Sequence, residues 1–289
     1  MEKKIYGIVG YPVKHSLSPA MQNAAFRELK IDAEYRLFEV PDGGLEQFLD
    51  KVKSGNNISG INVTIPHKIK AGEYLGHSGS LDEGALRLGA VNTIKVCDDG
   101  ALRGFNTDGS GFYRSLVEDL KFEPEGRNVF VLGSGGAAKA IVMYLGDAPK
   151  AIAVFDTDRK KTAELAGHYA KYFDKKKLKI LSDAEEIGSV IGGSDLAVNA
   201  TPVGMNESDP SPIAKEFLRP GLYVYDLIYN RLRTQLVKDA NAAKAHALTG
   251  LGMLLYQGTA AFEIWTGKPA PVAVMRRGLT EALKEQGGA

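Results

Sequence analysis

A glycine-rich turn at residues 133–138 constrains the fold of this chain more than any other feature. It reads Gly-Ser-Gly-Gly-Ala-Ala and lies between the apolar run Asn128–Leu132 and the helix-like run Lys139–Leu145. A strand, a Gly-x-Gly-x-x-Ala turn and a helix form the phosphate-binding start of a dinucleotide-binding unit. The first glycine makes the tight turn, the second admits the phosphates, and the last small residue lets the helix pack on the strand. The helix N-terminus then offers free N–H groups to the anion.

A second apolar run supports this interpretation. Ala151–Phe155 follows the turn and ends at Asp156, where the dinucleotide fingerprint has an acidic residue that binds the adenosine ribose. We therefore predict a nucleotide site in this part of the chain. A plain strand-to-helix turn is the alternative, because glycine-rich turns are common.

Length and composition narrow the class of protein. The 289 residues are enough for one large or two medium domains, and the net charge of +1 argues against a nucleic-acid partner. A single cysteine, Cys97, cannot form an internal disulfide. No apolar run approaches a membrane span, and the N-terminus shows no signal-peptide pattern. We expect a cytoplasmic protein with no membrane partner.

Short apolar runs alternate with longer amphipathic ones, which predicts an α/β fold with a largely parallel sheet. Strands are expected near residues 5–10, 34–39, 58–65, 90–97 and 101–105, and then near 128–132, 151–155, 195–199, 222–226 and 246–248. Helices are expected near 19–29, 44–53 and 66–75, and from about 251 to the C-terminus. Because the nucleotide unit occupies the middle, we expect residues 1–106 to bind a second substrate.

Two serines directly follow the first predicted strand. Pro19 suits the first position of a helix and Ser18 suits its N-cap. Ser16 and Ser18 are two residues apart, so both hydroxyls can also face an anion, such as a carboxylate, at the helix start. The capping role and the binding role remain open.

The segment Gly60–Lys68 combines polar and cationic side chains at one strand end. Asn62 and Thr64 are expected on one face of a strand, and Pro66 ends the strand and begins a helix that carries Lys68. Open α/β sheets bind ligands at the carboxyl ends of their strands. An ordinary surface lysine is the alternative for Lys68.

Two further polar residues lie in strand-like or capping positions. Asn92 interrupts an apolar run, and Asp108 begins the next helix. Asp108 can act as a helix cap, or as the carboxylate partner of an acid–base lysine such as Lys68. The histidines show no metal-ligand spacing, so no metal is expected.

These motifs together resemble the shikimate dehydrogenase family, which includes the quinate/shikimate dehydrogenases. The resemblance runs from Tyr6 to about Trp265 and depends on seven motifs in family order. They lie at residues 15–19, 62–68, 90–93, 106–108, 133–138, 199–205 and 252–258.

The resemblance implies an N-terminal α/β substrate domain and a Rossmann-type dinucleotide-binding domain, with the active site in the cleft between them. The corresponding ranges are 1–106 with 249–289, and 107–248. It also implies Lys68 and Asp108 as the catalytic pair. The implied substrate-binding residues are Ser16, Ser18, Asn62, Thr64, Lys68, Asn92, Asp108, Tyr229 and Gln257.

The implied reaction is a reversible hydride transfer that interconverts 3-dehydroshikimate and shikimate with NAD or NADP. The implied cofactor-binding residues are Gly133, Ser134, Gly135, Gly136, Ala137, Asp156, Asp158, Thr201, Pro202, Met205 and Gly250. NADP-dependent members usually have Asn-Arg-Thr after the second strand, whereas this chain has Asp-Thr-Asp at residues 156–158. We therefore expect a preference for NAD, with the cations at residues 159–161 facing solvent rather than binding a 2′-phosphate.

The serine pair favours shikimate over quinate as substrate, and the alternative is a quinate/shikimate dehydrogenase that oxidises quinate to 3-dehydroquinate with NAD. Tyr229 is not followed by the proline usual in the family, which leaves the shape of that loop open. Two rival functions are a methylene-tetrahydrofolate dehydrogenase-like enzyme and a non-catalytic nucleotide sensor. Either a monomer or a homodimer agrees with the sequence.

Overall fold

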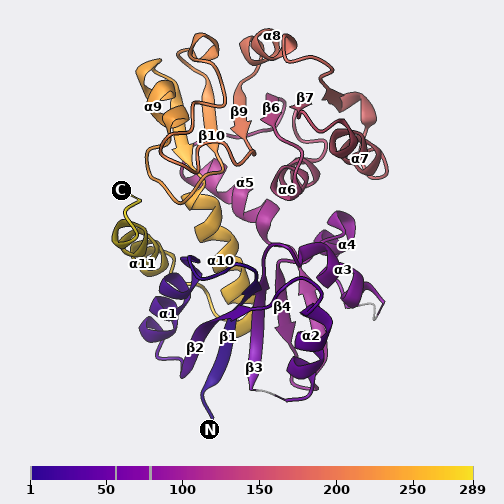
Figure 1. Cartoon of the computed structure of the whole chain (residues 1–289), viewed down its shortest axis with the longest axis vertical. Helices are drawn as coiled ribbons and strands as arrows, with labels where there is room; N and C mark the ends of the chain where they lie inside the picture. Colours follow the sequence, from indigo (N-terminus) through magenta and orange to yellow (C-terminus); the bar gives the residue numbers. More distant parts are fainter. Residues whose placement is uncertain (1, 56, 78–79, 289) are drawn as a thin grey trace. The chain divides into compact units, whose positions relative to one another are not determined.

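The chain forms two compact units, each built around its own sheet. A computed structural model describes residues 2–55, 57–77 and 80–288. The first unit comprises residues 1–107 and 255–286, and the second comprises residues 108–254 and 287–289. The predicted α/β class is confirmed (Figure 1).

The first unit contains a mixed five-stranded sheet in the order β2-β1-β3-β4-β5. The strands β1 (Lys4–Gly10), β2 (Ala33–Glu39) and β3 (Ile58–Val63) are parallel. The strands β4 (Thr93–Val96) and β5 (Leu102–Phe105) are antiparallel to their neighbours and form a hairpin. The sequence predicted these five strands, although β4 begins three residues later than expected.

Successive side chains of β1 point to opposite faces of the sheet, so the strand contacts a layer of helices on each face. Tyr6 packs on Phe26 and Trp265, from α1 (Ser18–Glu28) and α10 (Leu251–Thr266), while α11 (Val272–Glu285) packs against α1. Val9 packs in a separate core cluster with α2 (Leu45–Lys53), α3 (Lys68–Gly76) and α4 (Glu83–Leu88). The short helix α4 was not predicted.

The second unit contains a six-stranded sheet in which every pair of neighbouring strands is parallel, in the order β11-β10-β9-β6-β7-β8. In chain order this is the Rossmann arrangement, whose switch point lies between the first and fourth strands of the unit. The strands are β6 (Asn128–Leu132), β7 (Ala151–Phe155), β8 (Leu178–Ile180), β9 (Leu196–Asn199), β10 (Tyr223–Asp226) and β11 (His246–Thr249). The strand β8 was not predicted; it has three residues and directly follows a run of lysines.

Helices cover both faces of this second sheet, which explains its almost continuously apolar strands. On one face, α5 (Asp108–Glu118) packs beside α6 (Gly136–Leu145), which contacts α7 (Arg159–Tyr169). On the other face, α8 (Glu186–Gly192) and α9 (Gln235–Ala242) enclose a core that includes Phe130 and Val224. The unit also has two short 3₁₀ helices, at Lys175–Lys177 and Lys215–Phe217.

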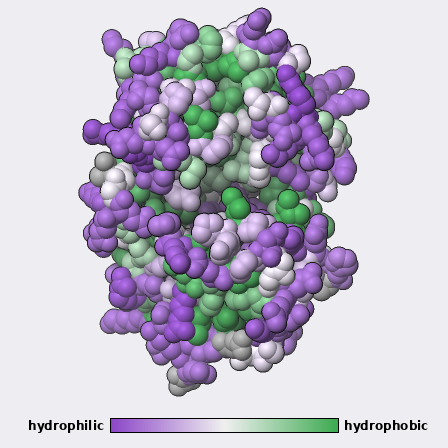
Figure 2. All heavy atoms as spheres, viewed as in Figure 1, coloured by the Kyte–Doolittle hydropathy of each residue, from purple (hydrophilic) through white to green (hydrophobic). Residues whose placement is uncertain are grey.

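The surface carries mostly hydrophilic residues on the face shown in Figure 2, with hydrophobic residues gathered in smaller areas. Among the helices of the described residues, none is both long and apolar enough to cross a membrane.

Candidate active site

The glycine turn lies between β6 and α6, as predicted. Gly133 has a φ of 107°, and a Cβ there would lie 2.9 Å from the backbone of Ala200, in the segment after β9. Only glycine fits this combination of positive φ and close approach. A Cβ at Gly135 or Gly136 would meet nothing within 4 Å, so the turn leaves open space beside the start of α6. A phosphate group fits this arrangement, because the first N–H groups of α6 have no partner within the helix.

Asp156, at the end of β7, is held by the glycine turn itself. Its Oδ2 accepts hydrogen bonds from the backbone N–H of Ser134 at 2.7 Å and from the Ser134 hydroxyl at 2.8 Å. Its Oδ1 accepts from the N–H of Asp158 at 2.9 Å. Burial by itself raises the pKa of Asp156, but these donors outweigh it and hold the pKa below its usual range. The carboxylate is therefore charged at neutral pH, and Oδ1 retains one acceptor position.

Asp158 has a structural role that the sequence analysis did not assign. Its side chain is the N-cap of α7 and accepts from the backbone N–H groups of Lys160 and Lys161, each at 3.1 Å. It also forms an ion pair with Lys161 Nζ at 3.1 Å. These contacts lower the pKa of Asp158.

The Arg159 side chain is exposed, as predicted, but its guanidinium also has protein partners. Its guanidinium donates to the backbone carbonyls of Leu181, at 2.9 Å, and Ser182, and it lies 5.8 Å from the centre of the Phe155 ring. These two carbonyls directly follow β8, a strand that was not predicted. Arg159 is thus anchored to the sheet.

The segment after β9 is organised by a buried pair. Asn199 donates from Nδ2 to Asp226 Oδ1 at 2.8 Å and to the carbonyl of Val203 at 3.0 Å. The Thr201 hydroxyl donates to Asn199 Oδ1 at 2.7 Å. Pro202 and Met205 lie on the same segment, and the Met205 side chain is exposed. This pairing shapes the segment that carries three of the predicted cofactor-binding residues.

Two predicted residues of the second unit lie beyond β10. Tyr229 is exposed on the loop that follows β10. A Cβ at Gly250 would lie 2.3 Å from the Leu227 carbonyl, so this position requires glycine. Gly250 therefore allows two backbone segments to meet.

In the first unit, the helix start at the serine pair differs from the prediction. Ser18 is the first residue of α1 and Leu17 is its N-cap, so the predicted capping role of Ser18 is wrong. The Ser16 Oγ accepts from the Ser18 N–H at 3.3 Å, which leaves the Ser16 hydroxyl hydrogen available to donate. Ser18 is buried and Ser16 is half-buried. The two serines therefore lie together at the helix start.

A buried polar network joins Asn62 to neighbouring strands. The Tyr35 hydroxyl donates to Asn62 Oδ1 at 2.7 Å, and Asn62 Nδ2 donates to the Asn92 carbonyl at 3.2 Å and to Thr93 Oγ1 at 3.1 Å. Burial raises the pKa of Tyr35, which the Ser18 side chain partly offsets by its own hydrogen bond to the hydroxyl. The network thus reaches from the serine pair to β4.

Asn92 continues this network toward α5. Its Oδ1 accepts from the Thr107 N–H at 2.8 Å, and its Nδ2 donates to Thr107 Oγ1 at 2.9 Å. Thr107 directly precedes Asp108, which is buried and begins α5. Asn92 therefore fixes the backbone from which Asp108 starts. The sequence motifs did not single out Tyr35, Thr93 or Thr107 as parts of the site, because their partners are distant in the chain.

Lys68 is the first residue of α3, and it is half-buried. Its carbonyl accepts from the Val91 N–H at 2.8 Å, next to Asn92. The preceding residue, His67, is fully buried, and its Nε2 lies 2.7 Å from the Val40 carbonyl. Thr64 lies just beyond the end of β3, with its methyl group close to Gly10. Gln257 is half-buried on α10.

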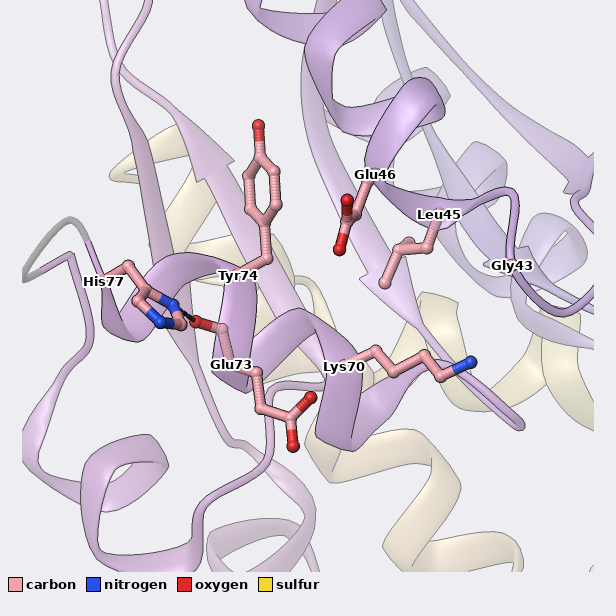
Figure 3. Close-up of a pocket in the computed structure, with 7 residues that line it drawn as sticks. All are labelled: Gly43, Leu45, Glu46, Lys70, Glu73, Tyr74 and His77. Carbon is pink, nitrogen blue, oxygen red and sulfur yellow. Dashed lines mark hydrogen bonds between the residues drawn. The ribbon is translucent and has the colours of Figure 1, made fainter.

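A surface hollow of about 510 Å³ lies between α2 and α3 (Figure 3). Two of its polar side chains have partners: Lys70 pairs with Asp42 at 2.6 Å, and the Tyr74 hydroxyl donates to Asp50 at 2.6 Å. None of the predicted site residues lines it. The hollow is therefore not the candidate active site. Among the described residues, no cluster of side chains suited to holding a metal ion is present.

Comparison with known proteins identifies the family. Residues 8–94 match the family described as "Shikimate dehydrogenase substrate binding domain", and residues 250–279 match "Shikimate 5'-dehydrogenase C-terminal domain". A relative from Methanopyrus kandleri, named shikimate dehydrogenase (NADP(+)), is 41% identical over 286 residues, which cover 98% of this chain and 97% of the relative. The chain belongs to the shikimate dehydrogenase family.

Solved structures of the family agree with this assignment. A shikimate dehydrogenase in complex with NADP+ has a TM-score of 0.88 and 37% identity, covering 97% of this chain and 96% of the other. A shikimate 5-dehydrogenase from Listeria monocytogenes, in complex with shikimate and NAD, has a TM-score of 0.85 and 33% identity, covering 95% and 96%. A quinate dehydrogenase from Corynebacterium glutamicum in complex with NAD has a TM-score of 0.88 at 28% identity, covering 96% and 99%. The family thus contains proteins solved with either cofactor.

Proposed function

We propose that this chain is a shikimate dehydrogenase that reversibly interconverts 3-dehydroshikimate and shikimate and prefers NAD to NADP. The observation that carries the proposal is the full-length similarity to shikimate dehydrogenases, together with an open glycine turn and Asp156 at the dinucleotide site. When bound, the nicotinamide supplies or accepts the hydride.

Lys68 and Asp108 are proposed as the catalytic pair. As the substrate ketone is reduced, negative charge develops on its oxygen, and the Lys68 ammonium stabilises that charge and then donates a proton. In the oxidising direction, neutral Lys68 accepts the hydroxyl proton. Asp108 orients the lysine and the hydroxyl, and its negative charge favours the charged form of the lysine. The Val91–Lys68 and Asn92–Thr107 hydrogen bonds support this proposal, because they fix the backbone at both catalytic residues.

Ser16 and Ser18 are proposed to bind the substrate carboxylate. Both lie at the start of α1, where the helix dipole favours an anion. Ring hydroxyls are proposed to bind at Asn62, Thr64, Asn92, Tyr229 and Gln257. Asn62 uses its amide hydrogens within the protein, so its remaining capacity toward a ligand is as an acceptor.

The preference for NAD rests on the groups around the end of β7. Asp156 is charged and keeps one acceptor position for the ribose 2′-hydroxyl, whereas a 2′-phosphate would meet like charge there. Two nearby cations are engaged elsewhere, since Arg159 binds two carbonyls and Lys161 pairs with Asp158. The relative from M. kandleri is named for NADP, so the proposed preference differs from the cofactor in that relative's name.

A four-way assay tests the proposal. Purified protein is given shikimate or quinate, each with NAD or NADP, and the absorbance of the reduced nicotinamide is followed. We expect kcat/KM to be highest for shikimate with NAD, and at least about tenfold lower for quinate, because a polar site that misplaces one hydrogen bond loses about 1–3 kcal/mol. Equal efficiency on the two substrates would refute the role of the serine pair. Equal or better use of NADP would refute the cofactor preference.

A further inference from the structure

One fully buried amide connects two helices that carry proposed substrate-binding residues. Gln22 lies one helical turn after Ser18 on α1, and its exposed fraction is 0%. Its Nε2 donates to the carbonyl of Gly258 on α10 at 2.8 Å. Residues four apart lie on the same face of a helix, so Gln22 contacts α10 with the face that also carries Ser18. Gly258 is the residue that follows Gln257.

The two helices approach each other closely at this contact. A Cβ at Gly258 would lie 2.2 Å from Met21 Cε and 3.3 Å from Gln22 Nε2. No real Cβ tolerates the first distance, so an alanine at this position would require the end of the Met21 side chain to move. The absence of a side chain at Gly258 therefore leaves room for Met21 and the Gln22 amide between α1 and α10.

Stability alone does not explain a glutamine at this position. Because a carbonyl can only accept, the atom that faces Gly258 must be the nitrogen, and Oε1 must point the other way. Oε1 is buried and has no hydrogen-bond partner among the described residues. A buried acceptor without a donor is costly, whereas an apolar side chain of the same size packs without that cost.

We propose that Gln22 is a positioning residue for substrate binding, and that its hydrogen bond to Gly258 places Gln257 relative to Ser18. The inference rests on the proposed function, in which Ser18 binds the carboxylate and Gln257 binds a ring hydroxyl. One substrate molecule contacts both residues. If α10 moved along α1, the substrate would keep its contact with one residue only by lengthening its contact with the other. Gln22 prevents this shift by tying the α10 backbone to the helix that begins at Ser18.

The substitution Gln22→Met tests this role, because it keeps the shape and removes the hydrogen bond. We expect the Kd and KM for shikimate to rise about five- to tenfold, the scale of one weakened hydrogen bond. The kcat is expected to stay within about twofold, because the contact acts equally in the bound substrate and the transition state. The melting temperature is expected to stay the same or rise, since the unpaired acceptor is gone. Gln22→His is expected to restore the KM, because the histidine Nε2 is as many bonds from Cβ as the glutamine Nε2.

A matched pair of glycines supplies the structural control. Gly258→Ala crowds Met21 and the Gln22 amide on α1. Gly278→Ala, on α11, places a Cβ 3.1 Å from the Ala20 carbonyl of α1 instead. We expect Gly258→Ala to raise the KM and Gly278→Ala to lower the melting temperature with no change in KM.

Two results would overturn the positioning role: an unchanged KM in Gln22→Met, or an equal rise in KM in Gly278→Ala. Calorimetry with shikimate alone gives the Kd without any cofactor. Failure of the wild-type protein to bind or oxidise shikimate would instead overturn the proposed function, before the variants are compared.

Discussion

The substitution Asp156→Asn tests the cofactor site directly, because the Asp156 carboxylate accepts three hydrogen bonds and is also predicted to bind the adenosine ribose. The substitution removes the charge while preserving the shape. A unit charge and a dianionic phosphate about 5 Å apart repel by about 1.7–3.3 kcal/mol at an effective dielectric constant of about 40–80. Salt screening reduces this value. We expect the ratio of kcat/KM for NADP to that for NAD to rise about 10- to 100-fold, since 1.4 kcal/mol corresponds to a factor of ten.

The same substitution also has a predicted structural cost. An amide has one accepting oxygen, which can keep the two Ser134 donors, but its NH₂ group then faces the N–H of Asp158. Losing a hydrogen bond to a charged group costs about 1.5–3 kcal/mol. We therefore expect a lower melting temperature, together with weaker binding of NAD.

Steady-state kinetics with both cofactors and fluorescence titration of NADH and NADPH separate these effects. Asp174→Asn is a suitable control, since Asp174 is an acidic residue of the same unit whose side chain caps the 3₁₀ helix Lys175–Lys177. It is expected to leave the cofactor ratio unchanged. If Asp156→Asn shifts the ratio by less than about threefold, or only by losing NAD while NADP efficiency stays constant, the repulsion argument is wrong.

Two other outcomes follow from the same structure. Lys68→Ala is expected to lower kcat by several orders of magnitude with shikimate binding largely kept, and a variant that retains more than about a tenth of the wild-type kcat would exclude Lys68 as the acid–base group. Burial raises the pKa of Asp226, outweighing the hydrogen bonds from Thr234, Asn199 and the Ile228 N–H. Folding therefore favours the protonated form of Asp226. The contribution of this group to the free energy of unfolding is fully present below the ordinary aspartate pKa of about 4, and it is lost as pH rises through the folded-state pKa. The melting temperature of Asp226→Asn relative to wild type should thus increase with pH above about 4, and a flat difference across a pH series of thermal melts would contradict this.

Local sequence patterns were enough to predict the class of fold and the family. Alternating apolar and amphipathic runs predicted the parallel strands, and the Gly-x-Gly-x-x-Ala turn located the dinucleotide-binding unit. These features are local: a positive φ at Gly133 and an apolar strand such as Asn128–Leu132 depend on neighbouring residues, which the sequence shows directly. The family motifs were recognisable for the same reason, because each is a short continuous segment.

Short or exposed elements were less predictable. The three-residue strand β8 is too short to show a periodic pattern of apolar residues, so the carbonyls just after it that bind Arg159 were not predicted. The helix start at Ser18 differed by one residue, because serine suits both the cap and the first turn. Helix and capping propensities alone do not distinguish adjacent positions such as the N-cap and the first residue of a helix.

The hydrogen bonds that support the proposed site residues depend on tertiary contacts that the sequence does not show. The Tyr35–Asn62 hydrogen bond joins two strands, the Asn92–Thr107 hydrogen bonds join the segments before β4 and after β5, and the Gln22–Gly258 bond joins residues 236 positions apart. A polar side chain in an apolar run signals that a partner exists, but its identity depends on which strands and helices become neighbours. The packing of the whole unit determines these neighbours. A buried donor or acceptor must form a hydrogen bond within the protein, so its partner is a group that the fold places nearby.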